Sequence, residues 1–393
     1  MRDPGEHVPA RLRTNRAVRG AVAVTILALV ASVLPPGLDA QAVRITDCVE
    51  CDLTATLVVQ LGTEDGAAAL AEPARVARRL NGQWVVTDYQ ESARLRVFTP
   101  EGELARAVGR RGEGPGEYDV AVWVSVTAGD SLRVADLGLG RITVLHPEHL
   151  IPVRTQRIGG PFREIAFLDD PLGRYVVAAP VMSRSGIGLP LHLMDEDGTV
   201  LRSFGAVSPI LDFRDNSKSW RNITVTPDGE VWSSGLTSYV LERWSPETGD
   251  RLEVLERGAD WFPPHERYGG GTLDPSQEQT PGRIEIHADR AGRLWTASHV
   301  AADDWQAAFE DGSDPYGNPA RRVYDISRYY DTIVEVISPV DARVVGRARL
   351  EGNVLSFPGD GLVATRALEP PGYPVVRVWR IELAPQNPSQ GGS

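Results

Sequence analysis

Two histidines and an aspartate in the second half of the sequence are of the residue types that bind metal ions. His287 lies in a strand-like apolar segment, and His299 is followed by Asp303. Imidazole and carboxylate groups bind Zn²⁺, and carboxylates also suit Ca²⁺. These three residues are therefore the candidate ligands for Ca²⁺ or Zn²⁺, and a metal-bound water would make the protein a hydrolase or lyase. No compact metal motif, Ser nucleophile elbow or GK[ST] loop occurs in the sequence, so whether the protein is an enzyme stays open.

Aromatic side chains gather in long segments between the expected strands. These segments cover residues 206–220, 257–282 and 297–331. Because binding sites often lie on loops carried by a rigid scaffold, a small-molecule ligand or a protein partner is expected on the face with these loops. Packing of the same rings onto the strands is the alternative. The candidate contact residues are Trp261, His265, Tyr268, Trp305 and Tyr330.

The elements that would position these residues are short strands that recur with tight Gly turns. Segments 82–88 and 94–102 have counterparts at 129–136 and 141–147. Similar strands, rich in Val, Ile, Leu, Thr and Trp, continue along the chain without a long amphipathic helix. Such repetition indicates a repeat fold. We predict an all-β, six-bladed β-propeller over residues 54–385, built from four-stranded antiparallel blades.

The two ends of this region are expected to meet in one blade. The sixth unit has no clear outermost strand, and the apolar strand at 54–60 has no partner in the first unit. A last blade shared by N- and C-terminal strands would leave only short, protected strand edges. Within the repeats, Asp136 precedes Arg141 as Asp88 precedes Arg94, which predicts a structural bridge across each loop.

Segment 108–118, with the sequence VGRRGEGPGEY, and the strands at 132–136 and 141–145 resemble an NHL repeat. The whole chain is similar to the exported bacterial six-bladed β-propeller proteins, specifically over residues 75–147 and in architecture beyond them. In those relatives a paired-Cys segment often precedes the first strand, and related propeller hydrolases and lyases bind a metal in the central channel. The resemblance implies the fold rather than one function, because propellers serve many functions.

The first 40 residues have the pattern of an export signal. Several Arg residues precede an apolar run at 21–34, which is shorter than the roughly 20 residues that span a bilayer. Residues 1–40 are expected to be a cleaved signal peptide, with an uncleaved membrane anchor as the alternative. The mature chain would then have no membrane span and would be periplasmic, cell-surface or secreted.

The segments on either side of the propeller are short, and the chain has a net negative charge. In the N-terminal segment 41–53, Cys48 and Cys51 are expected to form a local disulfide in an oxidising compartment. Residues 386–393 are expected to be a disordered tail. Loss of residues 1–40 would change the net charge from −12 to about −14. This negative charge excludes nucleic acid as a partner.

Overall fold

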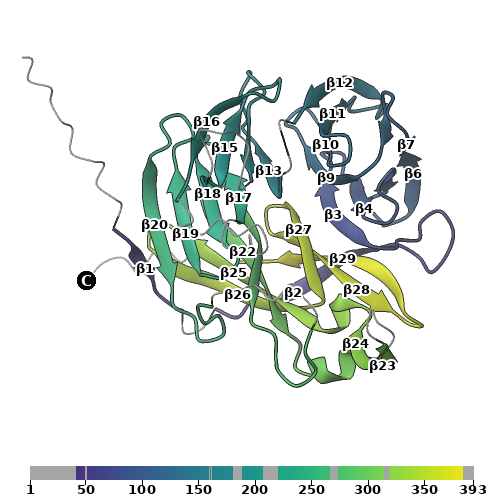
Figure 1. The fold of residues 1–393 in the computed structure, drawn as a ribbon, viewed down its shortest axis with the longest axis vertical. Coiled ribbons are helices and arrows are strands. Elements are labelled where there is room, and N and C mark those ends of the chain that lie inside the picture. The colour runs from purple at the N-terminus through teal and green to yellow at the C-terminus, as the bar shows by residue number, and fades with distance from the viewer. Residues whose placement is uncertain are drawn as a thin grey trace, which may run out of the picture. The chain divides into compact units, whose positions relative to one another are not determined.

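The computed structural model describes residues 41–48, 51–158, 160, 162–179, 188–206, 220–265, 273–313 and 318–383. These residues form β-strands and two short 3-10 helices, η3 (Trp305–Ala308) and η4 (Ile326–Arg328). Six sheets surround a central channel, so the predicted six-bladed β-propeller is confirmed (Figure 1). In the described part of the chain, no helix is long and apolar enough to cross a membrane. The expected signal peptide and C-terminal tail lie outside the described residues.

Each blade is an antiparallel sheet whose first strand lines the channel. Blade 1 contains β3 (Pro73–Arg78), β4 (Trp84–Asp88), β5 (Leu95–Phe98) and β6 (Leu104–Val108). Blade 2 contains β9 (Ala121–Val126), β10 (Leu132–Asp136), β11 (Arg141–Leu145) and β12 (Pro152–Arg157). Blade 3 contains β13 (Glu164–Phe167), β14 (Tyr175–Ala178), β15 (Leu191–Met194) and β16 (Val200–Phe204).

The second half of the ring repeats this order with two additions from the N-terminal part of the chain. Blade 4 contains β17 (Arg221–Val225), β18 (Val231–Gly235), β19 (Val240–Trp244) and β20 (Arg251–Arg257). Blade 5 contains β21 (Gly282–Ala288), β22 (Leu294–Ala301), β25 (Tyr330–Ser338) and β26 (Arg343–Glu351). Blade 6 contains β27 (Asn353–Gly359), β28 (Leu362–Glu369), β29 (Tyr373–Ile381) and β2 (Ala55–Leu61).

The N-terminal segment closes the ring and also crosses two other blades. β2 pairs antiparallel with β29 as the outermost strand of blade 6, which confirms the shared last blade. Upstream, β1 (Val43–Ile45) pairs parallel with β20, which makes blade 4 five-stranded and was not expected. Single bridges join Thr46 and Asp52 to β26 of blade 5. The predicted disulfide between Cys48 and Cys51 is present in this segment.

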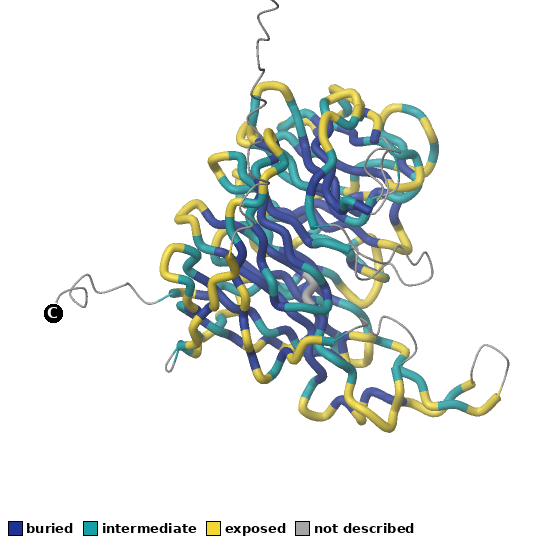
Figure 2. The backbone as a smooth tube through the Cα atoms, turned by 60° about the vertical axis from the view of Figure 1, so that its left-hand side comes forward, coloured by how far each residue is buried: buried dark blue, intermediate teal, exposed yellow. Residues whose placement is uncertain are grey.

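Hydrophobic side chains fill the space between neighbouring blades. Because side chains alternate between the two faces of a strand, each blade contributes to the interface on either side of it. Between blades 6 and 1, for example, Leu355 and Leu362 share a buried cluster with Val76 and Trp84. Comparable clusters lie at the other interfaces, and Figure 2 shows the burial running along the strands while turns are exposed.

The segment between β22 and β25 forms its own small unit. It contains a hairpin of β23 (Phe309–Ser313) and β24 (Pro319–Val323), flanked by η3 and η4. Trp305, Phe309, Tyr329 and Tyr330 form a buried aromatic cluster at its base. This insertion is therefore held to blade 5 by packing of its own rings.

Asp136 and Arg141 both bind backbone groups, but the predicted bridge between these two side chains is wrong. The Asp136 carboxylate accepts hydrogen bonds from the backbone N–H groups of residues 119, 120, 138 and 139 at 2.8–3.1 Å. Arg141 instead donates to the carbonyl oxygens of residues 113, 114 and 117. That segment includes β8 (Glu117–Tyr118), which pairs with β7 (Arg110–Arg111). Both side chains thus fix the backbone that links blades 1 and 2.

Candidate functional site

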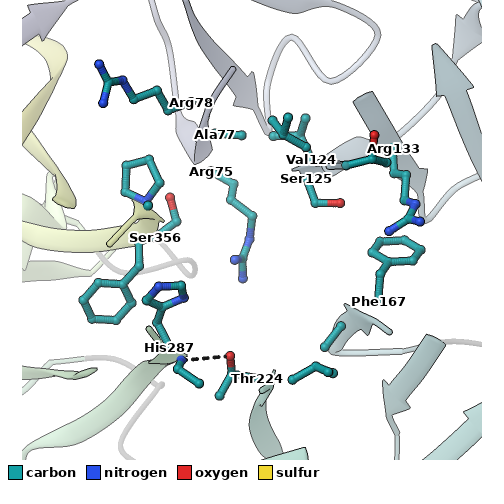
Figure 3. A pocket seen from close by; sticks show the side chains of 18 of the residues that line it. Arg75, Ala77, Arg78, Val124, Ser125, Arg133, Phe167, Thr224, His287 and Ser356 are labelled. Carbon is teal, nitrogen blue, oxygen red and sulfur yellow. Dashed lines mark hydrogen bonds between the residues drawn. The ribbon is translucent and has the colours of Figure 1, made fainter. Parts of the chain in front are cut away.

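The centre of the channel holds one guanidinium group between two carboxylates. Arg75 on β3 points toward the middle of the channel, as Figure 3 shows. Its Nη2 atom lies 2.8 Å from Oε1 of Glu285 on β21 and 3.2 Å from Oε1 of Glu164 on β13. The other oxygen of Glu164 accepts a hydrogen bond from the Ile223 N–H at 2.9 Å. The Arg75 guanidinium carbon also lies 3.3 Å from the centre of the Trp123 ring, so strands of five blades meet here.

Two carboxylates facing a single guanidinium leave one negative charge in excess. Burial, together with the charge of Glu285, raises the pKa of Glu164 from 4.5 to about 8, against the opposing charges of Arg75 and Arg163. Burial also raises the pKa of Glu285. The carboxyl pair therefore retains a proton near neutral pH, because desolvation penalises the second negative charge.

A cavity of about 730 Å³ extends from this group toward the turns that join the first and second strands of the blades. We call it the short-turn cavity. All six inner strands contribute to its wall, and Arg75, Glu164 and Glu285 form its floor. Sites for small molecules commonly have volumes of roughly 300–1,000 Å³. The cavity is thus large enough for a small organic ligand.

The wall of the short-turn cavity carries further polar and aromatic groups. Arg133 on β10 places its guanidinium carbon 4.4 Å from the centre of the Phe167 ring. On another side, His287 stacks on Phe357 with ring centres 5.8 Å apart, and its Nε2 lies 3.1 Å from Oδ1 of Asp360. Burial lowers the pKa of Arg133. The wall therefore combines cations with half-buried aromatic faces.

The channel narrows on the other side of Arg75, toward the long loops. A cavity of about 260 Å³, which we call the long-loop cavity, is lined there by His299 and Arg366 among other residues. His299 stacks on Tyr330 with ring centres 4.9 Å apart, and burial lowers its pKa to about 3, so its ring is neutral. Arg366 is held by both carboxylate oxygens of Asp325. Arg366 is thus committed to the protein, whereas both ring nitrogens of His299 and Oδ1 of Asn353 are buried without a hydrogen-bond partner among the described residues.

The structure separates the three proposed metal ligands. His287 lines the short-turn cavity and His299 lines the long-loop cavity. Because His299 pairs with Gly282 on β21, five residues before His287, the two imidazoles are roughly 16 Å apart along the strand. The carboxylate of Asp303 lies 2.9 Å from Arg349. Among the described residues, no group of three or more His, Cys, Asp or Glu side chains is placed to hold a metal ion.

The proposed ligand-contact residues are likewise not gathered in one pocket. Trp305 and Tyr330 are buried in the aromatic cluster at the base of the insertion. Trp261 packs edge-on against Tyr239, and Nδ1 of His265 lies 3.0 Å from the Pro263 carbonyl oxygen. None of these four residues lines either cavity, and Tyr268 lies outside the described residues.

Arg75, Glu164 and Glu285, which line the centre of the channel, belong to no sequence motif. Glu164 and Glu285 stand 89 and 210 residues from Arg75 along the chain. Their one shared feature is a position in the first strand of a blade. Listing the charged residues of every expected first strand would have brought them together as candidates.

The fold and the channel place the protein in the class of six-bladed β-propellers. No protein-family model matches the sequence, and no curated protein does. A Bacteroides fragilis protein described as exported has a similar structure, with a TM-score of 0.53 and 11% identity over 87% of this chain and 99% of that chain. This likeness shows the fold alone.

Two further solved structures are more distant. One is a structural-genomics protein of unknown function from Bacteroides thetaiotaomicron, with a TM-score of 0.48 and 10% identity over 85% of this chain and 77% of that chain. The other is the β-propeller domain of Cps50 (Swd1) from Myceliophteria thermophila, with a TM-score of 0.44 and 11% identity over 84% of this chain and 100% of that chain.

Proposed function

We propose that the protein is an exported binding module that holds a small molecule in the short-turn cavity. The observation that supports binding is a 730 Å³ cavity, lined by all six inner strands, that ends on the guanidinium group of Arg75. Ligand sites are commonly concave pockets with a few convergent polar groups, and the lining here mixes charged, polar and aromatic side chains. Support for export comes from the N-terminal sequence pattern and from the disulfide, a bond that persists in oxidising compartments. The blades are proposed to be NHL-like.

The long-loop face is the second candidate, as a surface for a protein partner. Within the insertion of blade 5, Tyr324 and Ile326 are exposed by 64% and 45%. Exposed apolar side chains close together are common at protein contacts. A partner at this face would leave the short-turn cavity free, so the two proposals are separable by mutation.

The proposed site is tested by filling the cavity. Ser125→Phe places a ring in the wall, and Ala128→Trp places one at the exposed rim of the same cavity. A matched control, Ala105→Trp, adds the same ring on β6, the outermost strand of blade 1. A library of neutral and charged fragments is screened against each folded variant by ligand-observed NMR, with circular dichroism as the check on folding.

We expect fragments that bind the wild type to bind Ala105→Trp equally and to be lost from both filled variants. Because Ala128 is exposed at a turn, its variant is expected to fold even if Ser125→Phe does not. Fragments that bind the folded Ala128→Trp variant as well as the wild type would overturn the short-turn cavity as the binding site.

A further inference from the structure

Arg133 is a half-buried cation that forms no ion pair within the described residues. Its guanidinium carbon lies over the Phe167 ring, 4.4 Å from the ring centre, and the side chain lines the short-turn cavity (Figure 3). Asp169 and Asp170 favour its charged form, but within the described part of the chain no carboxylate lies within ion-pair distance of it. A guanidinium stacked on a ring still presents its N–H edge, which fits a carboxylate in two parallel hydrogen bonds.

Arg75 offers a second set of donors on the floor of the same cavity. Both protein carboxylates contact Nη2, and neither Nη1 nor Nε has a hydrogen-bond partner among the described residues. Its side chain remains 16% exposed in the middle of the cavity. Glu164 and Glu285 retain one proton between them near neutral pH, so the pair carries a single negative charge. This charge equals the positive charge of Arg75.

The walls between these donors suit an apolar body. Phe167 and Phe357 are both half-buried and border the cavity on different inner strands, β13 and β27. Aromatic side chains bury large areas against a ligand ring with little loss of conformational freedom. A ligand with one charged end and one apolar or aromatic end would use both features of the wall.

Charged groups of both signs surround the cavity. Asp169, Asp360 and Glu285 line it, and Arg78, Arg79 and Arg290 line it in addition to Arg133 and Arg75. The ligand charge class therefore follows from shape: the planar fork of a guanidinium group matches a planar carboxylate in two parallel hydrogen bonds.

We infer that the short-turn cavity binds a small organic carboxylate, with the carboxylate on Arg133 and Arg75 and an apolar or aromatic body against Phe167 and Phe357. This inference rests on the proposed function, because it names the ligand class of the same cavity. It assigns to Arg133 the main role in recognising charge, and to Arg75 a supporting contact at the floor.

Benzoate and benzamide are the probes that test this inference, because they differ in charge and share the phenyl ring. Binding is measured by saturation-transfer NMR and calorimetry on the full-length exported chain at pH 7. Arg133→Gln removes the charge, and Arg133→Lys keeps it without the planar fork. Arg157→Gln is the matched control, because Arg157 is exposed on β12, the outermost strand of the same blade.

We expect benzoate to bind the wild type and Arg157→Gln alike, and about tenfold more weakly or worse to Arg133→Gln, the loss expected for one charge-assisted contact. Arg133→Lys should bind between the two. Benzamide should bind about tenfold more weakly than benzoate.

Equal binding of benzoate and benzamide, or an unchanged benzoate affinity in Arg133→Gln, would overturn the carboxylate assignment. Absence of benzoate binding up to about 10 mM would overturn it too. In each case the proposed function would still stand if neutral fragments bind the wild type and are lost from Ala128→Trp. If no fragment is lost from that variant, the proposed function itself fails.

Discussion

The two ends of the central channel differ in cavity volume and in the length of the loops around them. The larger cavity lies at the end with the shorter loops. The end surrounded by short turns holds the cavity of about 730 Å³, with half-buried rings in its wall and with Arg133, which no described carboxylate pairs. The end that carries the long insertion of blade 5 holds only about 260 Å³, and its neighbouring rings pack against each other. The insertion of blade 5 packs its own rings, and the larger cavity lies at the end where the turns are short.

This difference shows that loop length alone does not locate a ligand site. A long insertion needs its own buried cluster to be held in place, because an ordered backbone must recover its lost conformational entropy through packing. Aromatic residues in such an insertion are therefore used first for its own stability. Short turns make no such demand, and they leave the ends of the inner strands open.

The largest loss of stability is expected from removing the charge of Arg75, which lies between the two cavities. Arg75→Met should lower the free energy of unfolding by about 3–5 kcal/mol, because it leaves two buried carboxyl groups without their guanidinium partner. Urea denaturation measures the change, with Arg157→Gln as the control. Adding Glu285→Gln to Arg75→Met should restore part of the loss, and a variant as stable as the wild type would show that Arg75 does not balance these groups.

A similar but more local loss is expected at the long-loop end. Trp305→Ala should cost about 3 kcal/mol, because Trp305 is buried against Phe309 and Tyr329 with ring centres 6.0 and 5.5 Å away. Limited proteolysis should show faster cleavage within the insertion, while benzoate binding to the short-turn cavity stays unchanged. Loss of ligand binding with unchanged stability would instead support Trp305 as a ligand contact.

An effect that appears only as the pH changes is expected from the raised pKa of Glu164. Between its usual pKa of 4.5 and the folded value of about 8, the folded chain keeps a proton that the unfolded chain releases, so stability falls as pH rises through this window. Glu164→Gln should remove this fall, seen as a flatter dependence of the melting temperature on pH. The difference between the two curves isolates Glu164 from other titrating groups, and parallel curves would contradict the assigned proton.

The smallest effect is expected from shortening the exposed hairpin of the insertion. Replacement of residues 312–320 by a short Gly-Ser linker should change the free energy of unfolding by no more than about 0.5 kcal/mol, because Phe309 and the aromatic cluster remain. Benzoate binding should also remain. A large loss of stability would mean that the hairpin, and not only its base, holds the insertion on blade 5.

The blades could be predicted because their signals are local. Gly82 has a φ of 87° in the turn after β3, and Gly229 and Gly292 have φ values of 87° and 78° in the matching turns of blades 4 and 5. A positive φ favours glycine, so these turns are visible in sequence beside the apolar strands. The unpaired strand before blade 1 likewise pointed to closure with β29.

The site could not be predicted because its contacts are not local. Arg75 meets carboxylates 89 and 210 residues away, and nothing near any of the three residues distinguishes them from solvent-exposed charges. The Asp136 and Arg141 pattern was recognised as structural, yet its partners are backbone groups, which a list of side chains does not display. Spacing within a repeat therefore predicts the strands of each blade. The arrangement of the blades around the channel decides which side chains from distant parts of the sequence meet.

The path of residues 43–61 across blades 4, 5 and 6 has a consequence for biosynthesis. This stretch leaves the ribosome before any blade, but β1 needs β20, the single bridges need β26, and β2 needs β29. β2 is thus made before any blade but is the last of these segments to find its partner. It must wait for β29, the final strand of the ring, and a chaperone that shields β2 would protect the chain for nearly its whole passage.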